Sequence, residues 1–291
     1  MTAPLSPSPS SSPAAKPRTW RHRAWRIVRV PVIAYLGAVL LLLWFENSLI
    51  FLPSKYPAGE WQPNGLQYED ANFAAADGVK LHGWYVPAED PIAVVLFCHG
   101  NGGNLTHRED IIRAMQRYVG ATILVFDYRG YGRSEGTPSE RGVLSDARAA
   151  RAWLAKRAGI AEEDIVLMGE SLGGAVAVDL AANDGARALV LEDTFTSLPD
   201  MAAVHYPWLP ARWLMRSRLD SLAKISQYHG PLLMAHGDAD SIVPYAQGEQ
   251  LFAAANEPKP WIREPGVDHT DPRSPQYFDQ QRQFLSELPS P

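Results

Sequence analysis

The stretch that decides the fold is residues 168–174, Met-Gly-Glu-Ser-Leu-Gly-Gly. The apolar run 165–168 leads into this stretch and predicts a buried strand. The small apolar residues 174–178 lead out of it and predict a helix. A serine flanked by glycines at a strand-to-helix junction fits Gly-x-Ser-x-Gly, in which a sharp turn lifts the hydroxyl out of the sheet. The spacing Gly-x-Gly-x-x-Gly of a dinucleotide loop is absent. We therefore expect Ser171 to be a nucleophile.

On both sides of this stretch, strand-like and helix-like patterns alternate from about residue 66. An Asp-Gly turn at 77–78 joins runs 68–75 and 80–86 as a β-hairpin. Further strands are predicted at 92–98, 121–126, 164–168, 188–192, 232–236 and 260–264, and helices at about 105–118, 139–157, from 171, 245–256 and 275–288. A hairpin followed by βα repeats predicts an α/β fold, with a mostly parallel central sheet flanked by helices.

Two loops late in the chain carry candidates for an acid and a base. Residues 236–244 (HGDADSIVP) and 266–271 (GVDHTD) each follow a predicted strand. Loops at the carboxyl edge of a parallel sheet lie near one another, so Asp240 and His269 should meet Ser171 there. We predict a catalytic triad in which His269 takes the serine proton and Asp240 holds the imidazole in the required tautomer.

Other polar residues near these loops have structural interpretations. Asp238 is expected to stabilise its turn, and Asp193, one strand earlier, is the alternative to Asp240 as the acid. His99 is expected to orient the loop that it precedes. No histidines show the His-Glu-x-x-His spacing or a similar one, so no metal or other cofactor is predicted. The single cysteine, Cys98, excludes an intrachain disulfide and is expected to be a buried thiol.

A glycine-rich loop, residues 99–104 (HGNGGN), follows the first strand of the parallel region. Its glycines allow amide hydrogens to converge on a developing negative charge. We expect an oxyanion hole formed by the backbone N–H groups of Asn101 and of Leu172, the residue after the nucleophile. A phosphate-binding loop would require a following Gly-Lys-Ser/Thr, which is absent.

The N-terminal region differs from the rest of the chain. Residues 1–26 are rich in Pro, Ser, Ala and basic residues and are expected to be a disordered tail. Residues 27–52 include the uncharged apolar run 30–45 and are predicted to form a transmembrane helix. A cleaved signal peptide would need a small-residue cleavage site after this run, and a buried core helix would show polar positions at helical spacing. The sequence shows neither a small-residue cleavage site nor polar positions in the run. An uncleaved signal anchor fits both of these absences.

The arginines before the apolar run predict an orientation for this anchor. The positive-inside rule places the N-terminus in the cytoplasm and residues 53–291, the predicted catalytic domain, across the membrane. In a bacterium that compartment is the periplasm. The net charge of -5 and the absence of basic clusters elsewhere argue against a nucleic-acid partner.

Residues 193–230 form an insert between two predicted strands, expected as a small cap over the site. The insert contains four aromatic residues of interest: Phe195, Tyr206, Trp208 and Trp213. These side chains suggest an apolar acyl pocket for a small-molecule or lipid-like ester, although they could equally pack the cap onto the domain.

These motifs together resemble one subgroup of the α/β-hydrolase superfamily, the membrane-anchored, single-domain serine hydrolases of the bud-emergence type, which include animal abhydrolase-domain proteins. The matching stretches, between about residues 48 and 272, are DGVKLHGWYVP, FCHGNGGN, FDYRGYGRSEGTPSERG, GESLGG, EDTFTSLPDMA, HGDADSIVP and GVDH. The resemblance implies the α/β-hydrolase fold, the triad Ser171, Asp240 and His269, and the oxyanion donors Asn101 and Leu172. GVDHTD departs mildly from the more usual His-Asn after the glycine.

The resemblance leaves the substrate open, because related proteins cleave esters, thioesters and sometimes amides. We expect a serine hydrolase that cleaves carboxylic esters or thioesters through an acyl-enzyme. One alternative is a serine peptidase of the aminopeptidase type, for which Glu170 beside the nucleophile is the nearby hint. The other is a catalytically silent, membrane-tethered binding module, against which an intact triad argues.

Overall fold

The computed structural model describes residues 20–289, and the chain divides into two units at Trp44. The first unit contains helix α1 (Trp20–Trp44). Residues Ile27–Trp44 are long and apolar enough to cross a membrane, with a mean hydropathy of 2.2, a property that signal sequences share. The helix starts inside the segment 1–26 predicted as a disordered tail, because arginine is a good helix former. The rest of that tail, residues 1–19, lies outside the described residues.

The second unit begins before the predicted boundary at residues 52–53. Its first helix, α2 (Glu46–Ile50), follows Phe45 and is separate from α1. Glu46 is only 5% exposed, and its carboxylate accepts hydrogen bonds from the backbone N–H groups of Arg216 (3.1 Å) and Ser217 (2.6 Å). A buried carboxylate satisfied in this way belongs to a folded domain. Residues 45–52 of the predicted transmembrane segment 27–52 thus belong to the second unit.

The second unit is built on an eight-stranded sheet with the order β10-β9-β8-β7-β4-β6-β3-β2. The strands are β2 (Glu69–Ala74), β3 (Lys80–Val86), β4 (Val94–Cys98), β6 (Thr122–Phe126), β7 (Val166–Glu170), β8 (Ala188–Glu192), β9 (Leu232–Gly237) and β10 (Trp261–Glu264). β2 and β3 form the predicted hairpin, β3 pairs antiparallel with β6, and the pairs from β6 to β10 are parallel. Two short strands, β1 (Leu52–Pro53) and β5 (Gly102–Gly103), pair in parallel beside the sheet.

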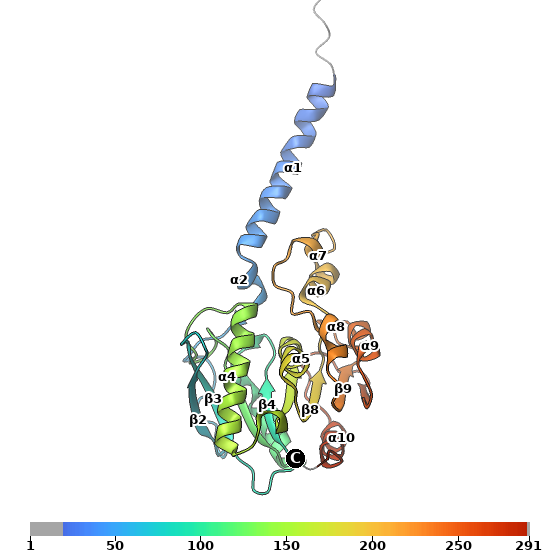
Figure 1. Cartoon of the computed structure of the whole chain (residues 1–291). Helices are drawn as coiled ribbons and strands as arrows, with labels where there is room; N and C mark the ends of the chain where they lie inside the picture. The colour runs from blue at the N-terminus through green and yellow to red at the C-terminus, as the bar shows by residue number, and fades with distance from the viewer. Residues whose placement is uncertain (1–19, 290–291) are drawn as a thin grey trace, which may run out of the picture. The chain divides into compact units, whose positions relative to one another are not determined.

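Helices cover both faces of the sheet, and Figure 1 shows α4 and α5 lying across one of them. The helical segments are η1 (Leu105–Arg108), α3 (Glu109–Ala114), η2 (Met115–Val119), α4 (Glu140–Ala158), η3 (Glu162–Asp164), α5 (Leu172–Asp184), α6 (Leu198–His205), α7 (Ala211–Leu214), α8 (Ser221–Lys224), η4 (Ile225–Gln227), α9 (Tyr245–Ala254) and α10 (Pro275–Ser286). One apolar core contains side chains of α4, α5 and α9, and the other contains side chains of α3, η2 and α10. The predicted α/β architecture is confirmed.

One predicted helix differs from the structure in its regularity. Residues 105–118 were expected to form a single helix, and they form a 3-10 turn, an α-helix and a π-turn in succession. The side chain of Asn104 accepts a hydrogen bond from the N–H of Thr106 and caps the first turn. The segment still covers one face of the sheet.

The turn between β7 and α5 depends on close backbone packing. Ser171 has φ 52° and ψ -116°, a conformation that L residues rarely adopt. A Cβ at Gly169 would lie 2.3 Å from the carbonyl oxygen of Gly173, and a Cβ at Gly173 would lie 1.9 Å from that of Cys98. Both positions therefore require glycine for the strand and helix to approach.

We predict that Gly173→Ala lowers the free energy of unfolding by about 1–3 kcal/mol or more, because the new methyl group overlaps backbone that cannot swing away. Urea unfolding followed by circular dichroism measures the change. Gly102→Ala is the control, since a Cβ there meets no atom within 4 Å. Equal stability of the two variants would show that the turn is less crowded than described.

Candidate active site

Ser171 lies at the carboxyl edge of the sheet, between β7 and α5. Its backbone N–H donates to the carbonyl of Glu192 (2.9 Å), and its carbonyl accepts from the hydroxyl of Thr194 (2.8 Å). These bonds tie the turn to the end of the neighbouring strand β8. The Ser171 side chain is free to point at the loops that follow β9 and β10.

His269, in the loop after β10, joins the other two predicted triad residues. Its Nδ1 lies 2.7 Å from Oδ2 of Asp240, and its Nε2 lies 3.1 Å from Oγ of Ser171. A carboxylate only accepts hydrogen bonds, so Nδ1 carries the hydrogen and Nε2 has a lone pair for the Ser171 hydroxyl. The structure thus brings Ser171, His269 and Asp240 together in the order that proton transfer requires.

Asp240 has a buried side chain in a turn that satisfies its other oxygen. Oδ1 accepts from the N–H groups of Ile242 (2.9 Å) and Val243 (2.7 Å), and Nε2 of His236 lies 3.3 Å from Oδ2. Burial alone would raise the pKa of Asp240, but hydrogen bonds from His236 and His269 outweigh it and hold this pKa well below its usual range. The carboxylate is therefore charged at neutral pH.

The pKa of His269 moves in the opposite direction. Burial lowers it, but the hydrogen bond and charge of Asp240, together with the charges of Asp193 and Glu170, raise it above the usual 6.5. A raised pKa strengthens Nε2 as a proton acceptor. It also means that the imidazole becomes neutral only at pH values above about 6.5.

Two aspartates fasten the Asp240 and His269 loops to each other. Oδ1 of Asp238 accepts from the N–H of Gly266 (2.6 Å), so Asp238 occupies the turn-stabilising position predicted for it. Oδ1 of Asp268 accepts from the N–H groups of Ser241 (2.7 Å) and His269 (2.7 Å). These bonds set the separation of the acid and the base.

Asp193, the alternative acid, points into a different network. Its Oδ1 accepts from the N–H of Gly237 (2.9 Å), and its Oδ2 is paired with the buried guanidinium of Arg273. Arg273 also contacts Glu192 (3.6 Å) and Glu264 (2.6 Å). Because Arg273 occupies this carboxylate, Asp240 is the acid that hydrogen-bonds His269.

Sequence reasoning did not anticipate Arg273. A usable signal was present, because Glu192, Asp193 and Glu264 stand at the carboxyl ends of β8 and β10, where buried acids need a cation. Burial raises the pKa of Glu192 to about 7 even with Arg273 beside it. The contact of His236 with Asp240 was also missed.

Ligand atoms of Asp193, Asp240 and His269 lie within 4.8 Å of one another, close enough to consider a metal ion. Both carboxylates already have partners, Arg273 for Asp193 and His269 for Asp240. A guanidinium in this position would repel a cation. We assign the group to the hydrogen-bond network around the triad.

The predicted oxyanion donors belong to adjacent strands, since Asn101 follows β4, Leu172 follows β7, and these strands pair directly. Among residues 20–289, neither backbone N–H donates a hydrogen bond, so both remain available. The Asn101 side chain fixes its loop: Nδ2 donates to the carbonyl of Ile50, and Oδ1 accepts from the N–H of Leu52 (3.2 Å) and the hydroxyl of Tyr131 (2.8 Å).

His99 and Glu170, both near the nucleophile, are engaged elsewhere. Nδ1 of His99 lies 2.7 Å from the carbonyl oxygen of Gly100, and burial lowers the pKa of His99 to about 3. The imidazole is therefore neutral and supports the loop. The carboxylate of Glu170 pairs with Nε of Arg108 at 3.1 Å.

The four cap aromatics named as substrate-binding candidates differ in their exposure. Phe195 is 3% exposed and belongs to the core beneath the cap. Tyr206, Trp208 and Trp213 are 54%, 55% and 87% exposed. The inward face of α7 is taken by Ala211, which leaves the larger side chains at the surface. A substrate pocket lined by these four residues stays a prediction.

Comparisons with known proteins give the relatives of this chain. The family described as the alpha/beta hydrolase fold matches residues 93–220. An uncharacterized protein of Mycobacterium tuberculosis is 40% identical over 275 residues, covering 92% of this chain and 96% of that protein. Protein bem46 of Schizosaccharomyces pombe is 31% identical over 285 residues, covering 90% and 94%. The Pyrococcus furiosus esterase Pf2001 superposes with a TM-score of 0.67 at 20% identity, over 81% of this chain and 99% of its own.

We predict that Asp240→Asn lowers the pKa of His269, because burial remains while the carboxylate that opposes its effect is lost. NMR titration of the imidazole Cε1–H signal measures this shift. Asp90→Asn, a change of the same charge at a distant exposed turn, should leave the titration unchanged. An unaltered His269 pKa in Asp240→Asn would contradict the described contact.

Proposed function

This chain belongs to the α/β-hydrolase superfamily as a bem46-type protein, and on that premise we propose that it is a serine hydrolase of carboxylic esters or thioesters. The observation that carries the proposal is the position of His269, 2.7 Å from Asp240 on one side and 3.1 Å from Ser171 on the other. This arrangement suits a serine activated by a general base.

The proposed reaction proceeds in two halves. Oγ of Ser171 attacks the acyl carbon while its proton passes to Nε2 of His269, and Asp240 stabilises the imidazolium. The imidazolium then protonates the leaving oxygen or sulfur, which departs and leaves an acyl-Ser171 ester. In the second half, His269 takes a proton from water while the water oxygen attacks the acyl carbon, and the imidazolium then returns this proton to Oγ of Ser171 as the acid is released.

The negative oxygen of each tetrahedral intermediate is proposed to accept from the N–H groups of Asn101 and Leu172. Leu172 is the first residue of α5, so its N–H is not used by the helix and lies at the positive end of the helix dipole. The three side-chain bonds of Asn101 support the second donor, because they fix the loop that presents it. Such pre-positioned donors need no reorganisation during the reaction.

An ester or thioester substrate fits the site better than a peptide with a free amino terminus. An aminopeptidase needs an unpaired carboxylate near the nucleophile to bind the ammonium group, and the carboxylate of Glu170 already pairs with Arg108. Because the three triad side chains meet at hydrogen-bond distances, their arrangement also favours an enzyme over a silent binding module.

We also propose that α1 anchors the protein in a membrane, with the N-terminus in the cytoplasm and the second unit on the other side. Support comes from the apolar stretch Ile27–Trp44 and from the arginines that precede it, at positions 18, 21, 23 and 26. In this orientation the substrate would be an extracytoplasmic or membrane-held acyl ester.

We predict that the full-length protein is labelled by a fluorophosphonate probe, and that Ser171→Ala abolishes labelling and lowers ester hydrolysis by about 10³-fold or more. Ser226→Ala, at an exposed serine, is the matched control and should behave as the unaltered protein. A panel of esters, thioesters and aminoacyl amides identifies the class of scissile bond. Unchanged labelling of Ser171→Ala would refute the assignment of the nucleophile.

We predict that kcat falls further as more of the hydrogen bonds to the Asn101 side chain are removed. Asn101→Ala removes three hydrogen bonds and should lower kcat by about 10- to 100-fold with little change in KM, because the donor is misplaced in the transition state. Tyr131→Phe removes one of the three bonds and should have a smaller effect. Steady-state kinetics on a soluble ester, with thermal unfolding as a check on folding, tests this order. Equal kcat in both variants would argue against the role of Asn101.

A further inference from the structure

The cap presents aromatic side chains to the surface of the second unit. Tyr206, Trp208, Trp213 and Leu214 belong to or border the short helices α6 and α7, and we call these four residues the cap aromatic face. The rings of Tyr206 and Trp208 meet edge to face with their centroids 6.3 Å apart. Exposing large rings to water is unfavourable, so such a face indicates a contact with another phase or molecule.

The charges near this face fit the headgroup region of a lipid bilayer. Arg212, Arg216 and Arg218 lie in the same segment of the cap, and their side chains are 64%, 73% and 48% exposed although each has an acidic partner, respectively Asp200 (2.8 Å), Glu46 (3.8 Å) and Asp220 (4.0 Å). Tryptophan and tyrosine favour the bilayer interface because their rings are apolar and carry one polar group, and arginine is attracted to lipid phosphates. Tryptophan, tyrosine and arginine all occur in this part of the cap.

This part of the cap is held by the first residues of the second unit, which directly follow the apolar helix in the chain. The carboxylate of Glu46 holds the backbone N–H groups of Arg216 and Ser217, and Glu46 is only two residues after Trp44. Two residues span at most about 7 Å. If α1 ends at the bilayer surface, the segment next to Trp213 must lie near that surface as well.

The cap aromatic face also borders the proposed active site. Nε2 of His205, at the end of α6, donates to the carbonyl of Ile242 (2.8 Å), which is two residues from Asp240. The Ile242 side chain is 44% exposed and continues the apolar surface toward the triad loops.

We propose that the cap aromatic face docks into the headgroup region of the same bilayer that α1 crosses, so that the active site opens toward the lipid surface. This inference rests on the proposed membrane span and not on the proposed hydrolysis. Trp208 and Trp213 enter the interface, and the neighbouring arginines contact lipid phosphates.

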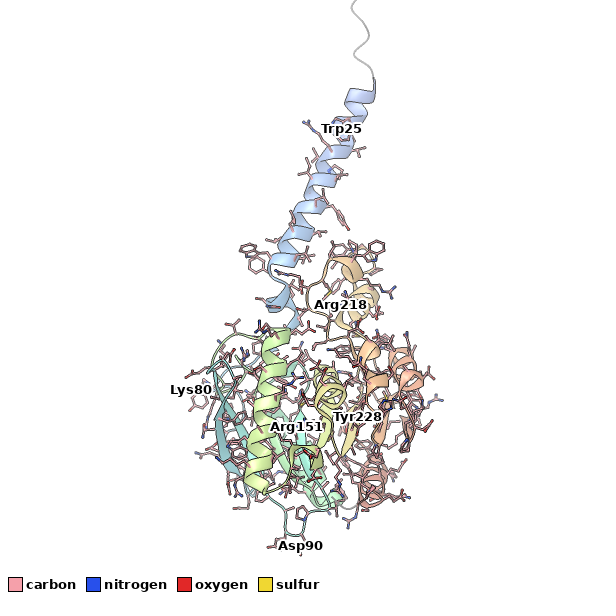
Figure 2. The ribbon with its side chains drawn as sticks, viewed as in Figure 1. Trp25, Lys80, Asp90, Arg151, Arg218 and Tyr228 are labelled. Atoms are coloured by element: carbon pink, nitrogen blue, oxygen red, sulfur yellow. The ribbon has the colours of Figure 1, made fainter. Side chains whose placement is uncertain are left out.

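Spin labels at single cysteines test this docking in the full-length protein. The only native cysteine, Cys98, is fully buried, so an introduced surface cysteine can be labelled selectively. The test positions are Trp213→Cys and Trp208→Cys. Arg141→Cys is a control at the same end of the unit, since Arg141 is exposed and lines a polar hollow with Glu46. Asp90→Cys is a control at the far end, opposite Arg218 in Figure 2.

Each labelled protein is placed in nanodiscs of phosphatidylcholine and phosphatidylglycerol, one copy per disc. Electron paramagnetic resonance then measures collisions of the label with oxygen, which concentrates in lipid, and with a water-soluble nickel chelate. For labels at 208 and 213 we expect the ratio of oxygen to nickel accessibility to exceed that at 90 and 141 by about threefold or more, as for side chains at the interface.

Two results would overturn the proposal. A ratio at 213 equal to that at 141 would mean that the face lies in water beside the membrane. Low access to both reagents would mean that protein, such as another part of this chain or a second copy, covers it. Fluorophosphonate labelling of the same samples reports on the hydrolase separately, so a failure of the proposed function is distinguishable from a failure of docking.

Discussion

The backbone strain at Ser171 is the constraint on which the site depends. A residue with φ 52° persists only where its surroundings leave no alternative, and here strand β7 and helix α5 press together through glycines that have no side chain to separate them. The same contact places Gly173 against the carbonyl of Cys98 at the end of β4. One packed junction therefore lifts the Ser171 hydroxyl above the sheet edge and brings the N–H of Leu172 beside the loop that carries Asn101.

The charges around His269 are arranged so that a single carboxylate acts on it directly. The carboxyl ends of the strands carry many acids, and left unpaired they would compete for the imidazole. Arg273 engages Asp193, and Arg108 engages Glu170. Of these carboxylates Asp240 is the one that hydrogen-bonds the His269 ring, while Asp193 and Glu170 act at longer range to raise its pKa. The site thus keeps a well-defined tautomer in a strongly acidic neighbourhood.

Much of this architecture could be predicted because it follows from local patterns. Apolar runs bounded by turn residues located the strands, and strand order along the chain located the loops of Ser171, Asp240 and His269 at one edge. The missed features depend on distant partners. Nothing near Arg273 in sequence indicates that it neutralises Glu192, and the outward direction of Trp213 depends on how α7 packs, which aromatic composition alone does not reveal.

The segment that follows α1 is a structural part of the catalytic unit. Glu46 binds the backbone of the cap at Arg216 and Ser217, and the main chain at Ile50 and Leu52 binds the side chain of Asn101. β1 and β5 extend this link, because Leu52 pairs with Gly102 in the glycine-rich loop 99–104. The stretch leaving the apolar helix therefore supports both the cap and the loop with a proposed oxyanion donor. A domain boundary placed after residue 52 would separate these supports from the cap and the loop. The second unit therefore begins at Phe45.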